Sequence, residues 1–193
     1  MLAGRHERFC AGYDMSVMLS GASAATELMT GGADLLLRLL SHPRPVVAAC
    51  TGHAVAAGAV ILLACDVRIG LDGPFQIGLN EVGIGLPLPS FVTTLAEERL
   101  DPRRFVAATL CAEIYDPPGA AQVGYLDRVV ATDVIAAATE EARRLASFPA
   151  DAFRLTKQSV RGGLVERLRQ ARGHDVELVA SLLGGQLPAG LSG

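Results

Sequence analysis

Apolar and polar positions along the chain fall into short blocks that predict alternating strands and helices. Residues 34–42 have helical periodicity, and Pro43 and Pro45 end that helix. The apolar run PVVAAC then predicts a buried strand, which Gly52 breaks. From Ala57 the segment AGAVILLA predicts a short buried helix, and DVRIG predicts another strand. The order of strand, glycine turn, helix and strand indicates an α/β fold.

The second half of the chain has more helical patterns. Asp101 followed by Pro102 predicts an N-cap with proline at the first helical position, so RRFVAATL should be a helix. A further helix is expected over GAAQVG, and Tyr125 to Val130 predicts a short strand.

The last third of the chain is nearly all helical in pattern. Thr132 should cap a helix that runs through IAAATEEARRLAS and stops at Pro149. Two amphipathic segments follow, at 151–161 and 164–184, and LPAGLSG is expected to be a frayed tail. We therefore predict two regions, a core over residues 1–131 and a helical C-terminal region over residues 132–193.

The composition excludes several classes of protein. A chain of 193 residues that is 50% hydrophobic and 19% charged can bury a sizeable core. The formal net charge is −3 and the basic residues are scattered, so there is no footprint for nucleic acid. The longest apolar run, around residues 54–65, is too short to cross a bilayer, and no signal peptide is recognisable. The four cysteines lie far apart without metal-ligand spacing, which favours a reduced, cytoplasmic protein without a metal site.

One acidic residue has unusual surroundings. The stretch FQIGLNEVGIG, residues 75–85, contains only Glu81 among apolar, amide and glycine residues. Its apolar neighbours would desolvate the carboxylate and raise its pKa toward that of a proton shuttle working near neutral pH. Considered alone, Glu81 is either such a shuttle or a loop carboxylate that faces solvent. Asn80 could orient Glu81 or simply shape the loop.

Three stretches together carry a resemblance to a known family: FCAGYD at 9–14, GHAVAAGAVILLACD at 52–66 and IGLNEVGIGLPLP at 77–89. Their order and separation resemble the crotonase, or enoyl-CoA hydratase/isomerase, superfamily, and AAQVGYLDRVV and LTKQSVR resemble its carboxyl-terminal pattern. The resemblance implies the crotonase spiral of β-β-α units and an acyl-CoA substrate. It also implies a homotrimer or hexamer in which residues 132–193 are the oligomerisation region. Because MLA looks like the stub of a strand with partners upstream, we expect a truncated N-terminus.

The resemblance also implies roles for individual residues. The backbone N–H groups of Tyr13 and Ala57 would form an oxyanion hole for the thioester oxygen, although many members have glycine where this chain has Ala57. The first turn of a helix suits an oxyanion because its N–H groups have no partner within the helix. No metal or separate cofactor is implied, since CoA is part of the substrate. Contacts with CoA are expected from Ala11, Asp14, Met15 and Gly58.

Glu81 matches the second of the two catalytic glutamates of some crotonases, while Val60 occupies the position of the first. Adding water to a 2-enoyl thioester is work that two carboxylates divide, whereas moving a double bond needs only one base that turns between two carbons. The sequence therefore looks most like the Δ3,Δ2-enoyl-CoA isomerases, with Glu81 as the single acid/base.

Other functions stay open at this point. A hydratase or another crotonase reaction would need a second group, such as His53, Asp14 or Glu113. A non-catalytic acyl-CoA-binding homologue would keep the pocket without activity. Nucleotide binding is disfavoured because neither GxGxxG nor GK[ST] is present.

Overall fold

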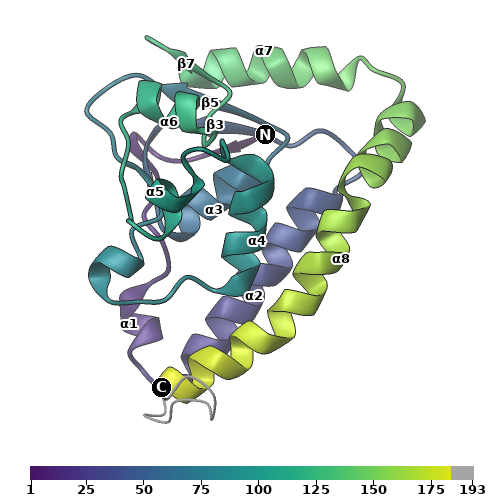
Figure 1. The fold of residues 1–193 in the computed structure, drawn as a ribbon. Coiled ribbons are helices and arrows are strands. Elements are labelled where there is room, and N and C mark those ends of the chain that lie inside the picture. Colours follow the sequence, from purple (N-terminus) through teal and green to yellow (C-terminus); the bar gives the residue numbers. More distant parts are fainter. Residues whose placement is uncertain (184–193) are drawn as a thin grey trace.

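The computed structural model describes residues 1–183 of the chain (Figure 1). The predicted tail LPAGLSG lies outside these residues. No helix in the described part of the chain is long and apolar enough to span a membrane.

Two parallel sheets form the centre of the fold, and consecutive strands alternate between them. The first sheet has the order β1-β3-β5-β7 and the second the order β2-β4-β6, with every pairing parallel. Helices follow each second strand, so the chain advances as a spiral of β-β-α units, as predicted. The strands are β1 (Leu2–Ala3), β2 (Glu7–Cys10), β3 (Val47–Cys50), β4 (Gly52–Val55), β5 (Val67–Leu71), β6 (Ile77–Gly78) and β7 (Arg128–Val130).

Helices surround the two sheets and form the lower right of the molecule in Figure 1. There α2 and α8 run side by side, and α4 packs against α8. The helices are α1 (Met15–Met18), α2 (Ala22–Ser41), α3 (Ala57–Ala64), the 3-10 turn η1 (Val82–Ile84), α4 (Ser90–Arg99), α5 (Phe105–Thr109), α6 (Pro117–Val123), α7 (Val134–Ala146) and α8 (Ala150–Leu183).

Strand β3 is buried on both faces, which explains its unbroken apolar sequence. Val47 and Ala49 pack in one cluster with residues of α7, which covers this side of the sheet. Ala48 and Cys50 point the other way, into the larger core built around α3. Because successive side chains of a strand point to opposite faces of the sheet, those of β3 alternate between two separate cores.

Helix α3 lies at the centre of the larger core, and a buried charged cluster holds its C-terminal end. The carbonyl oxygen of Cys65 accepts hydrogen bonds from Arg99 (2.9 Å) and Arg161 (3.3 Å). Asp66 forms ion pairs with Lys157 (2.6 Å) and Arg161 (3.2 Å). Cations at this end of a helix are favourable because its last carbonyl groups carry partial negative charge. The cluster therefore fixes the C-terminal end of α3.

Two predicted helix starts are wrong. Asp101 does not cap a helix, because its carboxylate accepts from the backbone N–H of Arg103 and pairs with that residue's guanidinium in a turn. The helix begins only at Phe105. Thr132 is not a cap either, since Asp133 supplies the side-chain oxygen that accepts from the first turn of α7.

Two predicted helix extents are also wrong. The expected helices 151–161 and 164–184 are one continuous helix, α8, that passes through Gly162 and Gly163. Side chains just beyond these glycines are buried in the larger core, so packing offsets the cost of glycine in a helix. Helix α2 begins at Ala22, three turns before the predicted start at residue 34.

Candidate active site

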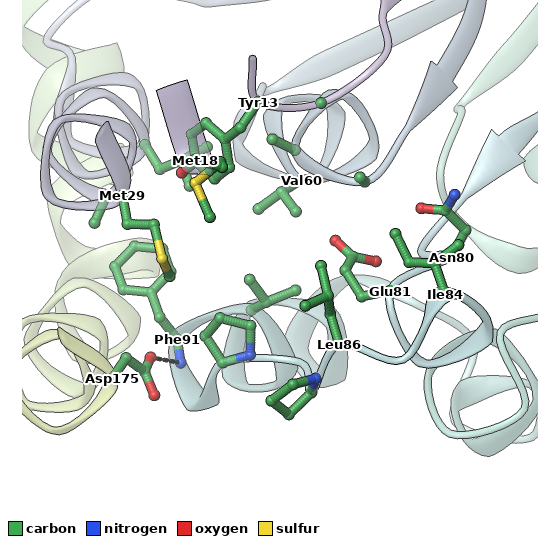
Figure 2. A pocket seen from close by; sticks show the side chains of 18 of the residues that line it. Tyr13, Met18, Met29, Val60, Asn80, Glu81, Ile84, Leu86, Phe91 and Asp175 are labelled. Carbon is green, nitrogen blue, oxygen red and sulfur yellow. Dashed lines mark hydrogen bonds between the residues drawn. The ribbon is translucent and has the colours of Figure 1, made fainter. Parts of the chain in front are cut away.

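A cavity of about 280 Å³ lies between the two sheets' connecting loops and the helices α2, α4 and α8. The residues that line it come from all three motif stretches and from the helices α1, α2, α4 and α8 (Figure 2). They are Ala11, Gly12, Tyr13, Met15, Met18, Met29, Ala33, Leu36, Ala56, Ala57, Val60, Asn80, Glu81, Ile84, Leu86, Pro87, Pro89, Phe91, Val92, Arg172 and Asp175. Tyr13, Ala57 and Glu81, the predicted catalytic residues, therefore share one cavity.

Glu81 lies in the loop after β6, at the start of η1. Its backbone carbonyl accepts from the amides of Ile84 (3.1 Å) and Leu86 (2.9 Å), which fixes the loop and the direction of the side chain. Figure 2 shows the carboxylate directed across the cavity toward Val60. Its Oε2 is buried and has no hydrogen-bond partner among the described residues. Burial raises the pKa of Glu81 above the ordinary value of 4.5, as the apolar sequence around it predicts.

Tyr13 and Ala57 come from separate segments that touch at their backbones. A Cβ built on Gly12, whose φ is +104°, would lie 3.2 Å from the Cβ of Ala56 and 4.0 Å from the amide nitrogen of Ala57. The strained residue is Ala56, with φ of 51° as the N-cap of α3, so alanine at position 57 is not itself strained. Ala56 offers no side-chain cap, and the Ala57 amide has no acceptor within the helix.

Gly58 allows the start of α3 to lie close to the end of β2. A Cβ at position 58 would lie 2.1 Å from the carbonyl oxygen of Cys10, so only glycine lets α3 pack directly on β2. Gly58 does not line the cavity, and neither does Asp14, whose carboxylate accepts from Ser16 to cap α1. Their contacts with CoA stay predictions, as do those of Ala11 and Met15, which do line the cavity.

The cavity has two acidic lining residues in the described part of the chain, and they are differently engaged. Asp175 accepts hydrogen bonds from the amide and hydroxyl of Ser90 (both 2.7 Å) and from the amide of Phe91 (2.6 Å), and so caps α4. In Figure 2 it lies on the other side of the cavity from Glu81. Val60 is only 3% exposed and presents methyl groups where a second base would stand. Of the two, Glu81 is therefore the residue whose carboxylate does not cap a helix.

The alternative second groups lie elsewhere. His53 accepts from the amide of Gln76 (3.1 Å) through Nδ1 and places its ring edge against Phe75, 5.5 Å between centroids. Glu113 forms an ion pair with Arg104 (3.0 Å). Neither side chain lines the cavity.

Sequence reasoning missed the wall formed by α4 and α8. Phe91 and Asp175 line the cavity and are joined by a hydrogen bond, yet they lie 84 positions apart in the sequence. Their sequences contain no local signal for this contact. Asn80, the chain's single asparagine, also lines the cavity, and its Oδ1 is buried without a partner among the described residues.

Comparison with known proteins identifies the family. A family model described as enoyl-CoA hydratase/isomerase matches residues 1–185. Human mitochondrial enoyl-CoA delta isomerase 1 is 30% identical over 178 residues, which are 91% of this chain and 59% of the human protein. The probable enoyl-CoA hydratase EchA17 of Mycobacterium avium is 31% identical over 196 residues, covering 98% of this chain and 76% of that protein.

A solved structure shows the same fold. The crystal structure of an enoyl-CoA hydratase/isomerase family protein from Pseudomonas syringae superposes with a TM-score of 0.88 at 43% identity, covering 91% of this chain and 76% of the other. The predicted crotonase fold is therefore confirmed. The chain spans about 59% of the length of the human relative. With a matching family model over nearly its whole length and this fold, the chain belongs to the enoyl-CoA hydratase/isomerase family.

Proposed function

We propose that the protein is a Δ3,Δ2-enoyl-CoA isomerase in which Glu81 is the single acid/base. The observation that carries the proposal is a half-buried carboxylate that faces Val60 across a mostly apolar cavity and whose Oε2 has no hydrogen-bond partner among the described residues. A carboxylate with a raised pKa can both take and return a proton near neutral pH. A valine opposite it can do neither.

In the proposed reaction the thioester oxygen of a 3-enoyl-CoA accepts hydrogen bonds from the amides of Tyr13 and Ala57. Glu81 removes a proton from carbon 2, and the negative charge spreads onto the thioester oxygen, where the two amides stabilise it. Glu81 then gives the proton to carbon 4, and the double bond moves from carbons 3 and 4 to carbons 2 and 3. One proton is moved and no other reactant is consumed.

The relatives support this reaction without deciding between it and hydration. The human relative is named as an isomerase, and the mycobacterial relative as a probable hydratase. Hydration is the second candidate, and it would need a group beside Glu81 to activate or deliver a proton. We also expect a homotrimer or hexamer, which sedimentation analysis of the purified protein would test.

Product analysis separates the candidates. The purified protein is offered a 3-enoyl-CoA and a 2-enoyl-CoA in separate reactions, and the products are identified by chromatography and mass. Formation of 2-enoyl-CoA from the first substrate, without a hydroxyacyl product from the second, is expected. Hydration of the 2-enoyl-CoA at a rate comparable to isomerisation would contradict the proposal, and binding without any conversion would indicate a non-catalytic acyl-CoA-binding protein.

A further inference from the structure

The half of the cavity that lies away from Glu81 and Asn80 is lined mostly by apolar side chains, with Asp175 of α8 at its edge. Figure 2 shows Met18 beside the Tyr13 ring at this end, with Met29 further along the wall and Phe91 next to Met29. Burying a hydrocarbon tail is worth roughly 0.8 kcal/mol for each CH₂, and this end of the cavity offers the apolar surface for it. An acyl chain whose thioester is held at the amides of Tyr13 and Ala57 would therefore extend toward these side chains.

The ring of Tyr13 has a fixed seat on α2. A Cβ built on Gly32 would lie 1.9 Å from the Tyr13 hydroxyl oxygen and 2.8 Å from its Cζ, so any other residue at position 32 would overlap the phenol. Glycine in the middle of a helix costs roughly 0.5–1 kcal/mol relative to alanine. Gly31, the preceding helical residue, has nothing within 4 Å of its own Cβ position. The position of the Tyr13 phenol thus explains why residue 32 is glycine, whereas nothing near Gly31 requires a glycine there.

The walls around the acyl tail differ in how far they can adapt. Met18 and Met29 are flexible thioethers that fill irregular gaps and can rearrange around a ligand. The Tyr13 ring is rigid, and burial raises the pKa of its phenol, which keeps it neutral. Its backbone is held next to the Ala56 turn through Gly12. The rigid ring beside these adaptable side chains is therefore the group that limits the space.

We propose that the Tyr13 ring, seated on Gly32, is the specificity-determining element that limits the length of the acyl chain. The inference rests on the proposed acyl-CoA function of the cavity but not on which reaction occurs there. It assigns the side chain of Tyr13 a role separate from that of its backbone amide.

The test compares two neighbouring substitutions, Gly32→Ala and Gly31→Ala. Ordinary contact begins at 3.4 Å, so the Gly32→Ala methyl group must push the phenol about 1.5 Å, and the open cavity is where it can go. Gly31→Ala makes the same change in helix propensity without touching the ring. The readout is the dissociation constant of saturated butanoyl-, hexanoyl-, octanoyl- and dodecanoyl-CoA, which cannot be isomerised.

Gly31→Ala is expected to keep the wild-type dependence of affinity on chain length. Gly32→Ala should bind butanoyl-CoA with a dissociation constant within about twofold of wild type. For longer chains its affinity should fall by about fourfold for each methylene that no longer fits, because a buried methylene contributes ~0.8 kcal/mol. Tyr13→Leu, which removes the ring without adding bulk, should move the preference toward longer chains. If Gly32→Ala fails to fold, Tyr13→Leu still tests the role of the ring.

The possible failures are distinguishable. If none of the esters binds the wild-type protein, the proposed acyl-CoA function is wrong. If they bind but Gly32→Ala and Tyr13→Leu keep the wild-type length dependence, the cavity function stands and the role of the Tyr13 ring is wrong.

Discussion

Replacing Gly58 by alanine should disable the proposed oxyanion hole while leaving its two amides in the sequence. The added Cβ would lie 2.1 Å from the carbonyl oxygen of Cys10 and 2.8 Å from its carbonyl carbon. Both neighbours are backbone atoms of β2, so no side-chain rotation can relieve the overlap. Helix α3 and β2 must separate by about 1.3 Å, the difference between 2.1 Å and the 3.4 Å at which ordinary contact begins.

This separation would move the Ala57 amide away from the Tyr13 amide, because the first belongs to α3 and the second follows β2. A misplacement of about 1 Å at a reacting centre can cost roughly 10²-fold in rate, and loss of one oxyanion donor costs about 10²- to 10³-fold. We therefore expect kcat for isomerisation to fall by about 10²-fold. Overpacking should also lower the free energy of unfolding by about 1–3 kcal/mol.

The assay measures kcat with a 3-enoyl-CoA and the free energy of unfolding by urea titration on the same folded preparation. Gly162→Ala is the control, because its Cβ meets nothing within 4 Å on the exposed side of α8. The control should keep wild-type kcat and gain up to about 1 kcal/mol of stability. A Gly58→Ala protein with wild-type kcat would refute the proposed pairing of the two amides.

Three further predictions concern charged groups. Asp66→Asn leaves the Lys157 ammonium buried without its partner, so urea titration should show a loss of about 3–5 kcal/mol, whereas Asp151→Asn at an exposed pair should lose under about 1 kcal/mol. Asp175→Ala removes the side-chain cap of α4 and should cost about 0.5–2 kcal/mol; an unchanged unfolding midpoint would contradict that role. The raised pKa of Glu81 means that its contribution to stability is present below the ordinary value of 4.5 and is lost as pH rises through the folded-state pKa. Glu81→Gln should therefore unfold at a higher temperature than wild type at about pH 8 but not at about pH 4. A difference in unfolding temperature that appears only at acid pH would contradict this.

The parts of the fold that local sequence specifies were predictable. Helix α3 begins and ends within one residue of its expected limits, because an apolar segment between a glycine turn and Asp66 has few other ways to bury itself. The position of Glu81 in the cavity was predictable for a similar reason. Ile77 and Leu79 on its N-terminal side are buried and bring the carboxylate to the cavity, whereas Val82, Ile84 and Leu86 on its C-terminal side are 40%, 58% and 41% exposed.

The parts that depend on distant partners were not predictable. Helix α4 has no capping residue of its own, because the oxygen atoms that accept from its first amides belong to Asp175, 85 positions away from Ser90. Gly162 and Gly163 predict a break, but α8 continues because α2 and α4 pack along it. The far wall of the cavity is built from these helices. Its composition therefore follows from the tertiary fold and not from any motif.

The central claim is that one carboxylate, on Glu81, moves the proton. Its most direct test is Glu81→Gln, a change that keeps the shape of the side chain and removes the base. In one preparation, the rate of conversion of 3-enoyl-CoA to 2-enoyl-CoA is measured together with the dissociation constant of a saturated acyl-CoA. The rate should fall by about 10²- to 10⁴-fold while the dissociation constant stays within a few fold of wild type. An unchanged rate would show that another group carries the proton.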